Sequence, residues 1–222
     1  MTRETRPVSW LKPALREFET FPAGAKSICL AALTIAAEGG KADIAKPVHG
    51  LGSGVFEIAL PFRVVYAVQL GAEIWVVHAF QKKSKRGIQT PQHEIDLIRD
   101  RIKRLQGDVG MKTHSKKPKP LSPVRGSGNV FRDLRHDNAD MEQLKVILAA
   151  EIIKALDRDG LTVRAAHGRT GTAAADFSRI RNASLDRFTV DRLIAILNKL
   201  GSRVEVKVRV RRAAPVARAA TA

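Results

Sequence analysis

The sequence predicts an α+β domain, in which helices pack on an antiparallel sheet, followed by an all-α domain with a C-terminal strand. Three observations lead to this fold class. Apolar residues alternate with a period of two between residues 55 and 80, which is typical of strands. They recur at helical spacing over most of residues 140–200. Between these regions, residues 107–128 carry four lysines and three prolines and contain no apolar run that would form a core.

This change of pattern sets the predicted domain boundaries. Residues 1–106 form the first domain, residues 107–128 a basic Pro/Gly linker, residues 129–211 the second domain, and residues 212–222 a disordered tail. A chain of 222 residues is long enough for two small domains. Met111 lies just inside the linker, where a second protein would start, so we infer that two functional units are written as one polypeptide.

The composition points to nucleic acid as the partner. The net charge is +17, with 16 Lys and Arg against 11 Asp and Glu in residues 1–110, and 23 against 11 in residues 111–222. Both halves are therefore attracted to polyanions, the second more strongly. No apolar run approaches the roughly 20 residues that span a bilayer. A single cysteine, Cys29, excludes an intrachain disulfide, and no cluster has metal-ligand spacing. We expect a reduced, cytoplasmic protein without metal, cofactor or membrane contact.

The first domain is predicted from its periodicities in chain order. They indicate a short strand at residues 8–10, helices at 11–18 and 25–38, strands at 55–60, 63–68 and 73–80, and a last helix from 91 to 105. Short reversals between the three later strands favour an antiparallel meander. We expect the helices to cover one face of the sheet.

The residues that suggest chemistry lie near the strand ends. Arg63 leads the second strand of the meander, and His78 lies near the end of the third. Four cations follow within five positions: Lys82, Lys83, Lys85 and Arg86. Such a cluster can hold a phosphodiester backbone and stabilise charge that develops on a phosphate. From charge alone, the alternative is a solvated loop whose lysines keep the chain soluble.

The segment from residue 51 to residue 104 resembles the RelE/ParE toxin superfamily, in its HigB-like, phage-derived branch. The matching parts are LGSGVFEI, RVVYAV, HAFQKKSKRG and TPQHEIDLIRDRIKRL, in that order. RelE-like members cut mRNA in the ribosomal A site without a metal, with the ribose 2′-hydroxyl as nucleophile. The resemblance implies catalytic roles for Arg63, Lys82 and Lys83, with His78 either assisting proton transfer or serving the structure. It also implies RNA contacts by Lys85 and Arg86.

The hairpin before Arg63 is shorter than in relatives. They place a turn of several residues before this strand, whereas here Leu60, Pro61 and Phe62 run straight into Arg63. The deletion either shifts the register by one residue or leaves Arg63 on the upstream strand, with the catalytic arginine missing. An inactive toxin-like domain is therefore an alternative.

The second domain begins with a helix over residues 141–156, for which Asp140 is the expected N-cap. Thr162 is expected to cap a helix at residues 163–169, Gly171 to make the turn, and Thr172 to cap a helix at residues 173–182. Thr189 should cap a helix at 190–200, and the alternation at 204–210 predicts a strand.

The run LTVRAAHGRTGTAAADFSRIRNAS resembles the helix-turn-helix of Xre-family antitoxins of the HigA type. Such antitoxins neutralise a toxin by direct contact and repress their own operon as dimers. On this resemblance residues 172–182 form the recognition helix, Arg179 contacts bases, and Asp176 brings a negative charge close to DNA. The remaining predicted DNA-binding residues are Thr172, Ala174, Ala175, Ser178, Arg181 and Asn182, and we expect Arg164 and Arg169 to assist from the preceding helix.

These patterns predict a type II toxin–antitoxin fusion: a ribosome-dependent mRNA endonuclease neutralised by a DNA-binding autorepressor. The expected partners are operator DNA, ribosome-bound mRNA, a toxin–antitoxin contact within or between chains, and a second copy in a homodimer. Two alternatives remain open. One is a DNA-binding regulator that carries an inactive toxin-like domain, and the other is a ParE-like gyrase inhibitor.

Overall fold

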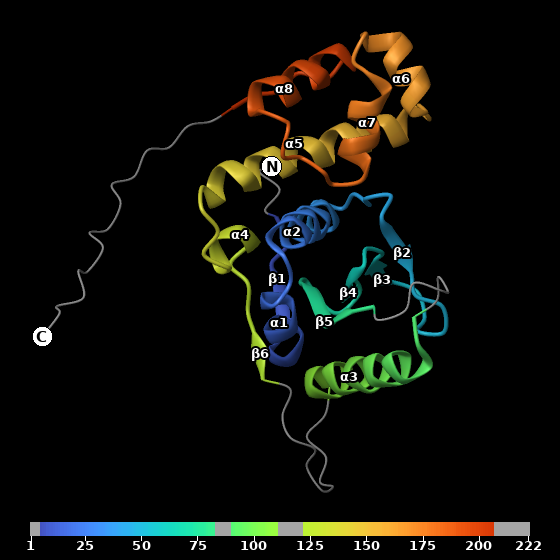
Figure 1. Ribbon diagram of the computed structural model, residues 1–222, viewed down its shortest axis with the longest axis vertical. Helices are drawn as coiled ribbons and strands as arrows, with labels where there is room; N and C mark the ends of the chain where they lie inside the picture. The colour runs from blue at the N-terminus through green and yellow to red at the C-terminus, as the bar shows by residue number, and fades with distance from the viewer. Residues whose placement is uncertain (1–4, 83–89, 111–121, 207–222) are drawn as a thin grey trace, which may run out of the picture.

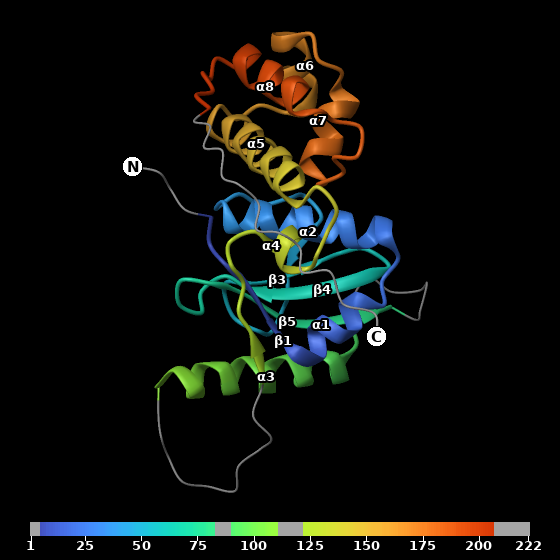
Figure 2. The same cartoon turned by 90° about the vertical axis from the view of Figure 1, so that its left-hand side faces the viewer.

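The computed structural model describes residues 5–82, 90–110 and 122–206. Figures 1 and 2 show a stack in which α5 to α8 lie above α2, α2 lies above a sheet, and α3 lies below it. The strands are β1 (Val8–Leu11), β2 (Ala45–Pro47), β3 (Val55–Ile58), β4 (Phe62–Ala67), β5 (Ile74–Gln81) and β6 (Pro123–Val124). The helices are α1 (Lys12–Glu19), α2 (Ala23–Ala37), α3 (Gln92–Gly110), α4 (Val130–Asp133), α5 (Ala139–Arg158), α6 (Val163–Thr170), α7 (Ala174–Arg181) and α8 (Val190–Lys199).

The six strands form one sheet in the order β2-β3-β4-β5-β1-β6. All neighbouring strands are antiparallel except β1 and β5, which pair in parallel. The predicted meander is β3-β4-β5, and its short connection leaves Arg63 within β4, opposite Phe80 of β5. A bulge between Val65 and Tyr66 shifts the β4/β5 register there. The α+β class predicted for the first half is confirmed, with a sheet that is mostly antiparallel.

The end of the segment expected to be a linker lies on the N-terminal sheet. Strand β6 pairs with β1, and the backbone N–H of Gly126 donates to Oγ of Ser9 at 3.1 Å. A Cβ atom at Gly126 would lie 2.3 Å from the carbonyl oxygen of Val8, so this close approach requires glycine. The strand is only two residues long, and one of them is Pro123, which donates no backbone hydrogen bond. Periodicity therefore gave no sign of it.

Helices cover both faces of the sheet, whereas we predicted cover on one face. Helix α2 lies on one side and α3 on the other (Figure 2). Ile98, Ile102 and Leu105 of α3 are buried and fix this helix against the sheet. The polar residues of α3, which suggest a solvent-exposed helix in the sequence, include Glu94 and Arg101, and both are bonded to the β5 residue His78.

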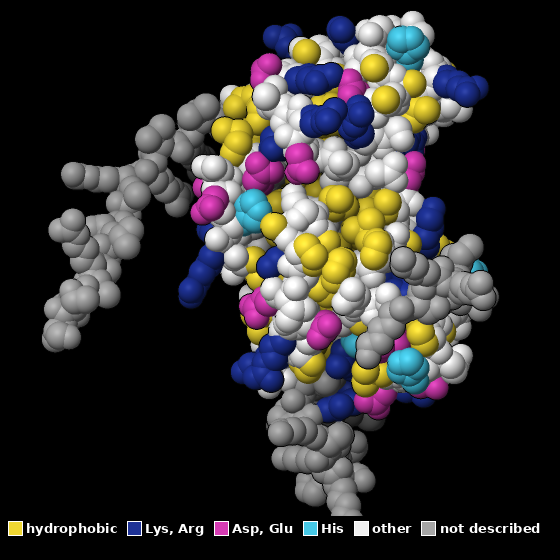
Figure 3. Space-filling model, viewed as in Figure 1, with side chains coloured by type: hydrophobic (Ala, Val, Ile, Leu, Met, Phe, Trp, Pro, Cys, Tyr) yellow, Lys and Arg dark blue, Asp and Glu magenta, His cyan; other side chains and the backbone are white. Residues whose placement is uncertain are grey.

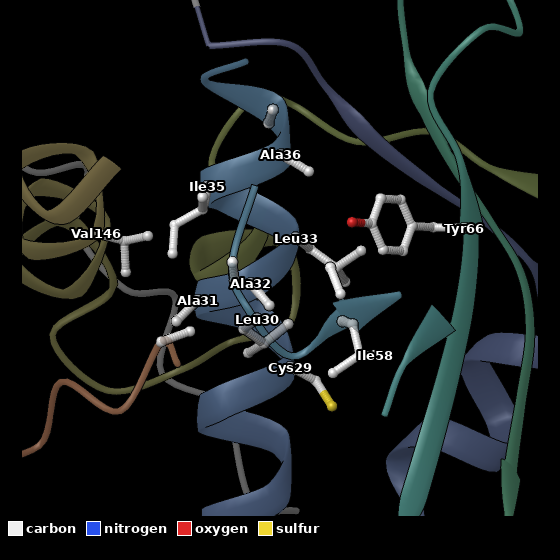
Figure 4. Close-up of a cluster of buried hydrophobic side chains, with 14 of the residues drawn as sticks. Cys29, Leu30, Ala31, Ala32, Leu33, Ile35, Ala36, Ile58, Tyr66 and Val146 are labelled. Carbon is white, nitrogen blue, oxygen red and sulfur yellow. The ribbon is translucent and has the colours of Figure 1, made fainter. Parts of the chain in front are cut away.

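Helix α2 is buried on two sides. Nine of its 15 residues are buried, in an unbroken run from Cys29 to Ala37. Figure 4 shows Leu33 directed toward Tyr66 and Ile58 of the sheet, while Ile35 lies on the side of Val146 of α5. The buried residues of both halves form one continuous hydrophobic cluster. A helix that is apolar all round needs cover on every side, and here the sheet and α5 provide it.

Over residues 129–206, the described part of the second domain, the regular elements are all helices, which confirms the predicted all-α class. Asn138 occupies the N-cap of α5 in place of the predicted Asp140, which instead accepts hydrogen bonds from Asn129 and Arg132. The predicted strand at residues 204–210 has no regular structure over residues 204–206. Its remaining residues lie outside the described part of the chain.

Candidate functional site

Arg63, the expected catalytic arginine, is buried and paired. Its side chain in β4 donates from Nη1 to Oε1 of Glu57 in β3, and the residue is only 6% exposed. The second carboxylate oxygen of Glu57 accepts from Oγ1 of Thr90 at 2.6 Å. A buried charge needs such a partner, because desolvation of an isolated ion is costly. In this state an incoming phosphate would have to compete with Glu57 for the guanidinium.

His78 in β5 is enclosed between two side chains of α3. Nη1 of Arg101 lies 2.8 Å from Nδ1 of His78, and Oε2 of Glu94 lies 2.6 Å from Nε2. Arginine can only donate, so Nδ1 accepts, and the proton of the neutral ring lies on Nε2 and points to Glu94. Burial lowers the pKa of His78, and the Arg101 charge lowers it further, against the raising effect of the Glu94 hydrogen bond. Both ring nitrogens are therefore engaged, which leaves neither available for proton transfer in this state.

The cationic cluster begins at the same end of the sheet as Arg63. The backbone N–H of Lys82 donates to the carbonyl oxygen of Pro61 at 2.9 Å, immediately after β5 ends. The structure therefore brings Lys82 and Arg63 to the same end of the sheet, where β4 begins and β5 ends. The other predicted members, Lys83, Lys85 and Arg86, lie outside the described residues.

Glu57, Glu94 and Arg101 complete this site, and sequence reasoning did not single them out. Glu57 gave a usable signal, because it is the one charged residue in an otherwise apolar strand and lies on the same face as Val55, which is buried. A charged residue at such a position indicates a buried partner. Glu94 and Arg101 gave none, because acidic and basic residues on a helix are usually solvated.

The helix-turn-helix consists of α6, a turn at Gly171 and α7. Oγ1 of Thr162 accepts from the backbone N–H of Ala165 at 3.2 Å, so the predicted cap of α6 is confirmed. Gly171 has a φ of 69°, which glycine adopts without strain. The predicted cap of α7 by Thr172 is wrong: Ala173 occupies the N-cap, and no side chain caps this end. The backbone carbonyl of Thr172 instead bonds to Nδ1 of His167 at 2.9 Å.

The predicted DNA-contact residues fall into two groups. Ala175 and Ser178 are exposed near the start and middle of α7, Thr172 and Ala174 are half-buried, and Arg179 is partly exposed and paired with Asp176. On the face shown in Figure 3, Lys and Arg side chains gather over this helical half, with acidic side chains among them. Arg164 is also exposed. Arg169 instead bonds to Asp159 and to the backbone carbonyl oxygen of Leu200.

Arg181 and Asn182 belong to the second group, at the end of α7 that faces the first half. Nη2 of Arg181 bonds to Asp157 at 2.7 Å, and its carbonyl oxygen accepts from the backbone N–H of Asp43 at 2.7 Å. The side-chain amide of Asn182 bonds to the carbonyl oxygen of Ser178. Arg181 is therefore an interdomain residue in this state, and the start of α7 is its accessible end.

The contact between the two halves combines an apolar centre with a polar margin. Residues of α2, among them Ile35, pack toward Val146 of α5 (Figure 4). At the margin Arg181 meets Asp43, and Oγ of Ser27 lies 3.4 Å from Oδ1 of Asp186. We call this contact the α2–α5 interface. It lies on the opposite side of the sheet from α3, and therefore from the buried Arg63 and His78.

The described residues contain neither a candidate membrane-spanning helix nor a candidate metal-binding cluster. Across residues 5–82, 90–110 and 122–206, no helix combines the length and apolar character that crossing a bilayer requires. In the same part of the chain, His, Cys, Asp and Glu side chains do not gather in threes as metal ligands would.

Two family models match the chain, one in each half. Residues 16–103 match the model described as phage derived protein Gp49-like, and residues 130–209 match a model described as a helix-turn-helix domain. The first match contains the sheet from β2 to β5, and the second contains α4 to α8. Neither a curated protein nor a solved structure matches the chain.

Proposed function

Because the chain joins a Gp49-like, phage-derived toxin domain to a helix-turn-helix domain, we propose that it is a type II toxin–antitoxin fusion. The N-terminal domain is a ribosome-dependent, metal-independent mRNA endonuclease. The C-terminal domain neutralises it and represses the chain's own operon as a DNA-binding homodimer. The observation that carries this proposal is the α2–α5 interface, because it joins the two domains through a shared hydrophobic core.

The interface supports a permanent association within one chain. Separating the domains would expose residues of α2 that are fully buried, among them Ile35. A newly exposed apolar face of this kind is costly in water at roughly 25 cal/mol per Å². The toxin domain is therefore held by the antitoxin domain without a second molecule.

The geometry favours neutralisation from the far side of the sheet. The antitoxin domain packs on α2, while Arg63 and His78 lie toward α3. The antitoxin domain therefore adds bulk to the toxin without covering these residues, and this bulk hinders entry into the ribosomal A site. The pairing of Arg63 with Glu57 and of His78 with Glu94 fits an inactive state.

A charged residue at the interface tests the proposal in the full-length chain. Val146 is 1% exposed on α5, whereas Leu144, two residues away on the same helix, is 36% exposed. We expect expression of Val146→Asp to arrest growth and cause cleavage of ribosome-bound mRNA, because the buried carboxylate separates the domains. Leu144→Asp, the matched control, should remain harmless, and Val146→Asp combined with Lys82→Ala should lose the toxicity. A Val146→Asp chain that retains a folded N-terminal domain without cutting mRNA would refute the toxin assignment.

A second candidate function is a DNA-binding regulator whose toxin-like domain is inactive. The buried ion pair between Arg63 and Glu57 favours it, because an arginine that is buried in an ion pair is not accessible to RNA. This candidate predicts that the chain binds operator DNA while no interface variant cuts mRNA. The same experiment therefore separates the two candidates.

A further inference from the structure

Three charged side chains from two helices form one cluster beside the predicted recognition helix. Asp176 of α7 is 8% exposed and uses both carboxylate oxygens. Oδ1 accepts from Nη1 of Arg179 at 3.0 Å, and Oδ2 accepts from Nη2 of Arg192, on α8, at 2.6 Å. We call these three residues the Asp176 cluster. The acidic residue that the sequence places against DNA is thus compensated by two arginines, and the cluster carries a net charge of +1.

Both arginines remain partly open to solvent. The side chain of Arg179 is 39% exposed and that of Arg192 is 47% exposed. A guanidinium carries five N–H donors in a rigid fork, so one bond to Asp176 leaves donors for a base edge or a phosphate. Arg192 is also held from a second side, because its guanidinium lies 5.2 Å from the centre of the Phe188 ring.

The cluster adjoins the part of α7 that remains accessible. A hollow of about 290 Å³ separates the start of α7 from α8. Thr172 and Ala173 line it from one side, and Arg192 and Lys199 line it from the other. Arg192 therefore borders the surface that holds predicted DNA contacts, although it belongs to the helix after the recognition helix.

We propose that Arg192 is a DNA-contact residue and that Asp176 is a positioning residue, which holds Arg179 and Arg192 in place before DNA arrives. This inference rests on the proposed DNA binding through α7 and extends it to α8. Long side chains lose rotamer freedom when they bind, and a side chain already fixed by a carboxylate loses less. Guanidinium groups that are held in one orientation also favour one docking geometry on the duplex, and this supports discrimination between DNA sequences.

The positioning role and simple repulsion predict opposite effects of Asp176→Asn. If Asp176 only repels phosphates, removing its charge tightens binding to every duplex. If it positions the two arginines, the substitution releases them, so specific binding weakens while binding to a random duplex stays equal or tightens. We expect the ratio of specific to random affinity to fall about tenfold, the order of magnitude of one good base contact.

The test uses the full-length chain with two duplexes of equal length. One is the DNA upstream of the chain's own gene, and the other has a random sequence. Arg192→Ala should weaken binding to both duplexes and reduce the slope of log affinity against log salt by about one. Arg99→Ala is the control, because Arg99 is also a partly exposed arginine (39%) that pairs with an aspartate, but it lies on α3, away from the proposed DNA-binding surface. It should change neither affinity.

Thermal unfolding of each variant shows whether it is folded. An Arg192→Lys variant separates the charge of Arg192 from its shape, because it keeps the positive charge and loses the guanidinium fork. Tighter binding of Asp176→Asn to both duplexes would overturn the positioning role. Normal binding and an unchanged salt slope in Arg192→Ala would overturn the contact role. If the wild-type chain binds neither duplex at low salt, the proposed DNA binding fails, and this inference fails with it.

Discussion

Replacing Ile35 by alanine tests whether the two domains unfold as one unit. Ile35 is fully buried in α2, and the layers on both sides, the sheet and α5, leave little room for collapse around a lost side chain. Ile→Ala substitutions in cores cost 2–5 kcal/mol, and we expect about 3 kcal/mol here. For a chain of this size, that corresponds to a fall in Tm of about 6–12 °C.

Two probes observe the domains separately. Both tryptophans, Trp10 and Trp75, lie in the N-terminal sheet, so their fluorescence reports on the toxin domain. Far-UV circular dichroism also detects α5 to α8. In urea, the wild-type curves should coincide, and Ile35→Ala should move both curves together. The matched control Ile28→Ala, at a half-buried position on the same helix, should cause a smaller shift. If Ile35→Ala moves the fluorescence curve and leaves a separate, unshifted dichroism transition, the shared core is refuted.

Three further predictions concern individual contacts. Glu57→Gln should destabilise the chain by about 3–5 kcal/mol, because it leaves Arg63 buried without its counter-charge, and urea unfolding measures this loss. Burial lowers the pKa of His78 in the folded state, so below about pH 6.5 the unfolded state binds a proton at His78 more readily. The free energy of unfolding should therefore decrease as the pH falls below this value. His78→Gln should flatten this dependence in urea unfolding between pH 5 and 8. Thr162→Ala removes the side-chain cap of α6 and should lower the free energy of unfolding by about 1 kcal/mol, measured by thermal unfolding. Thr172→Ala should lower it much less, because the Thr172 side chain caps no helix.

Each of these predictions has a contrary outcome. An unchanged midpoint for Glu57→Gln would mean that the buried pair contributes nothing to stability. An identical pH dependence in His78→Gln would place the acid sensitivity elsewhere. Equal losses for the two threonine variants would contradict the cap assignment.

Much of the fold follows from local pattern. Alternation over residues 55–80 located β3, β4 and β5, because half-buried strands repeat every two residues. Thr162 and Gly171 located the start of α6 and the turn after it, because a cap and a positive φ require particular residue types. The order of the two domains followed from the change in periodicity across the basic segment.

The features that depend on distant partners were not predictable in this way. Strand β6 exists only because β1 offers it an edge, and two residues carry no periodicity. The burial of α2 on both sides depends on α5, more than 100 residues later in the chain. The pairing of Arg63 with Glu57, and of Asp176 with Arg192, likewise depends on side chains that tertiary structure brings together.

We propose above that the C-terminal domain silences the N-terminal domain within one chain. The most direct measurement maps the 5′ ends of a message in a reconstituted translation reaction to which purified chain has been added. We expect no new ends with wild type, new ends within the translated region with Val146→Asp, and none with Val146→Asp combined with Lys82→Ala. Intact message with a folded Val146→Asp chain would contradict this proposal, and so would equal cleavage by the wild type.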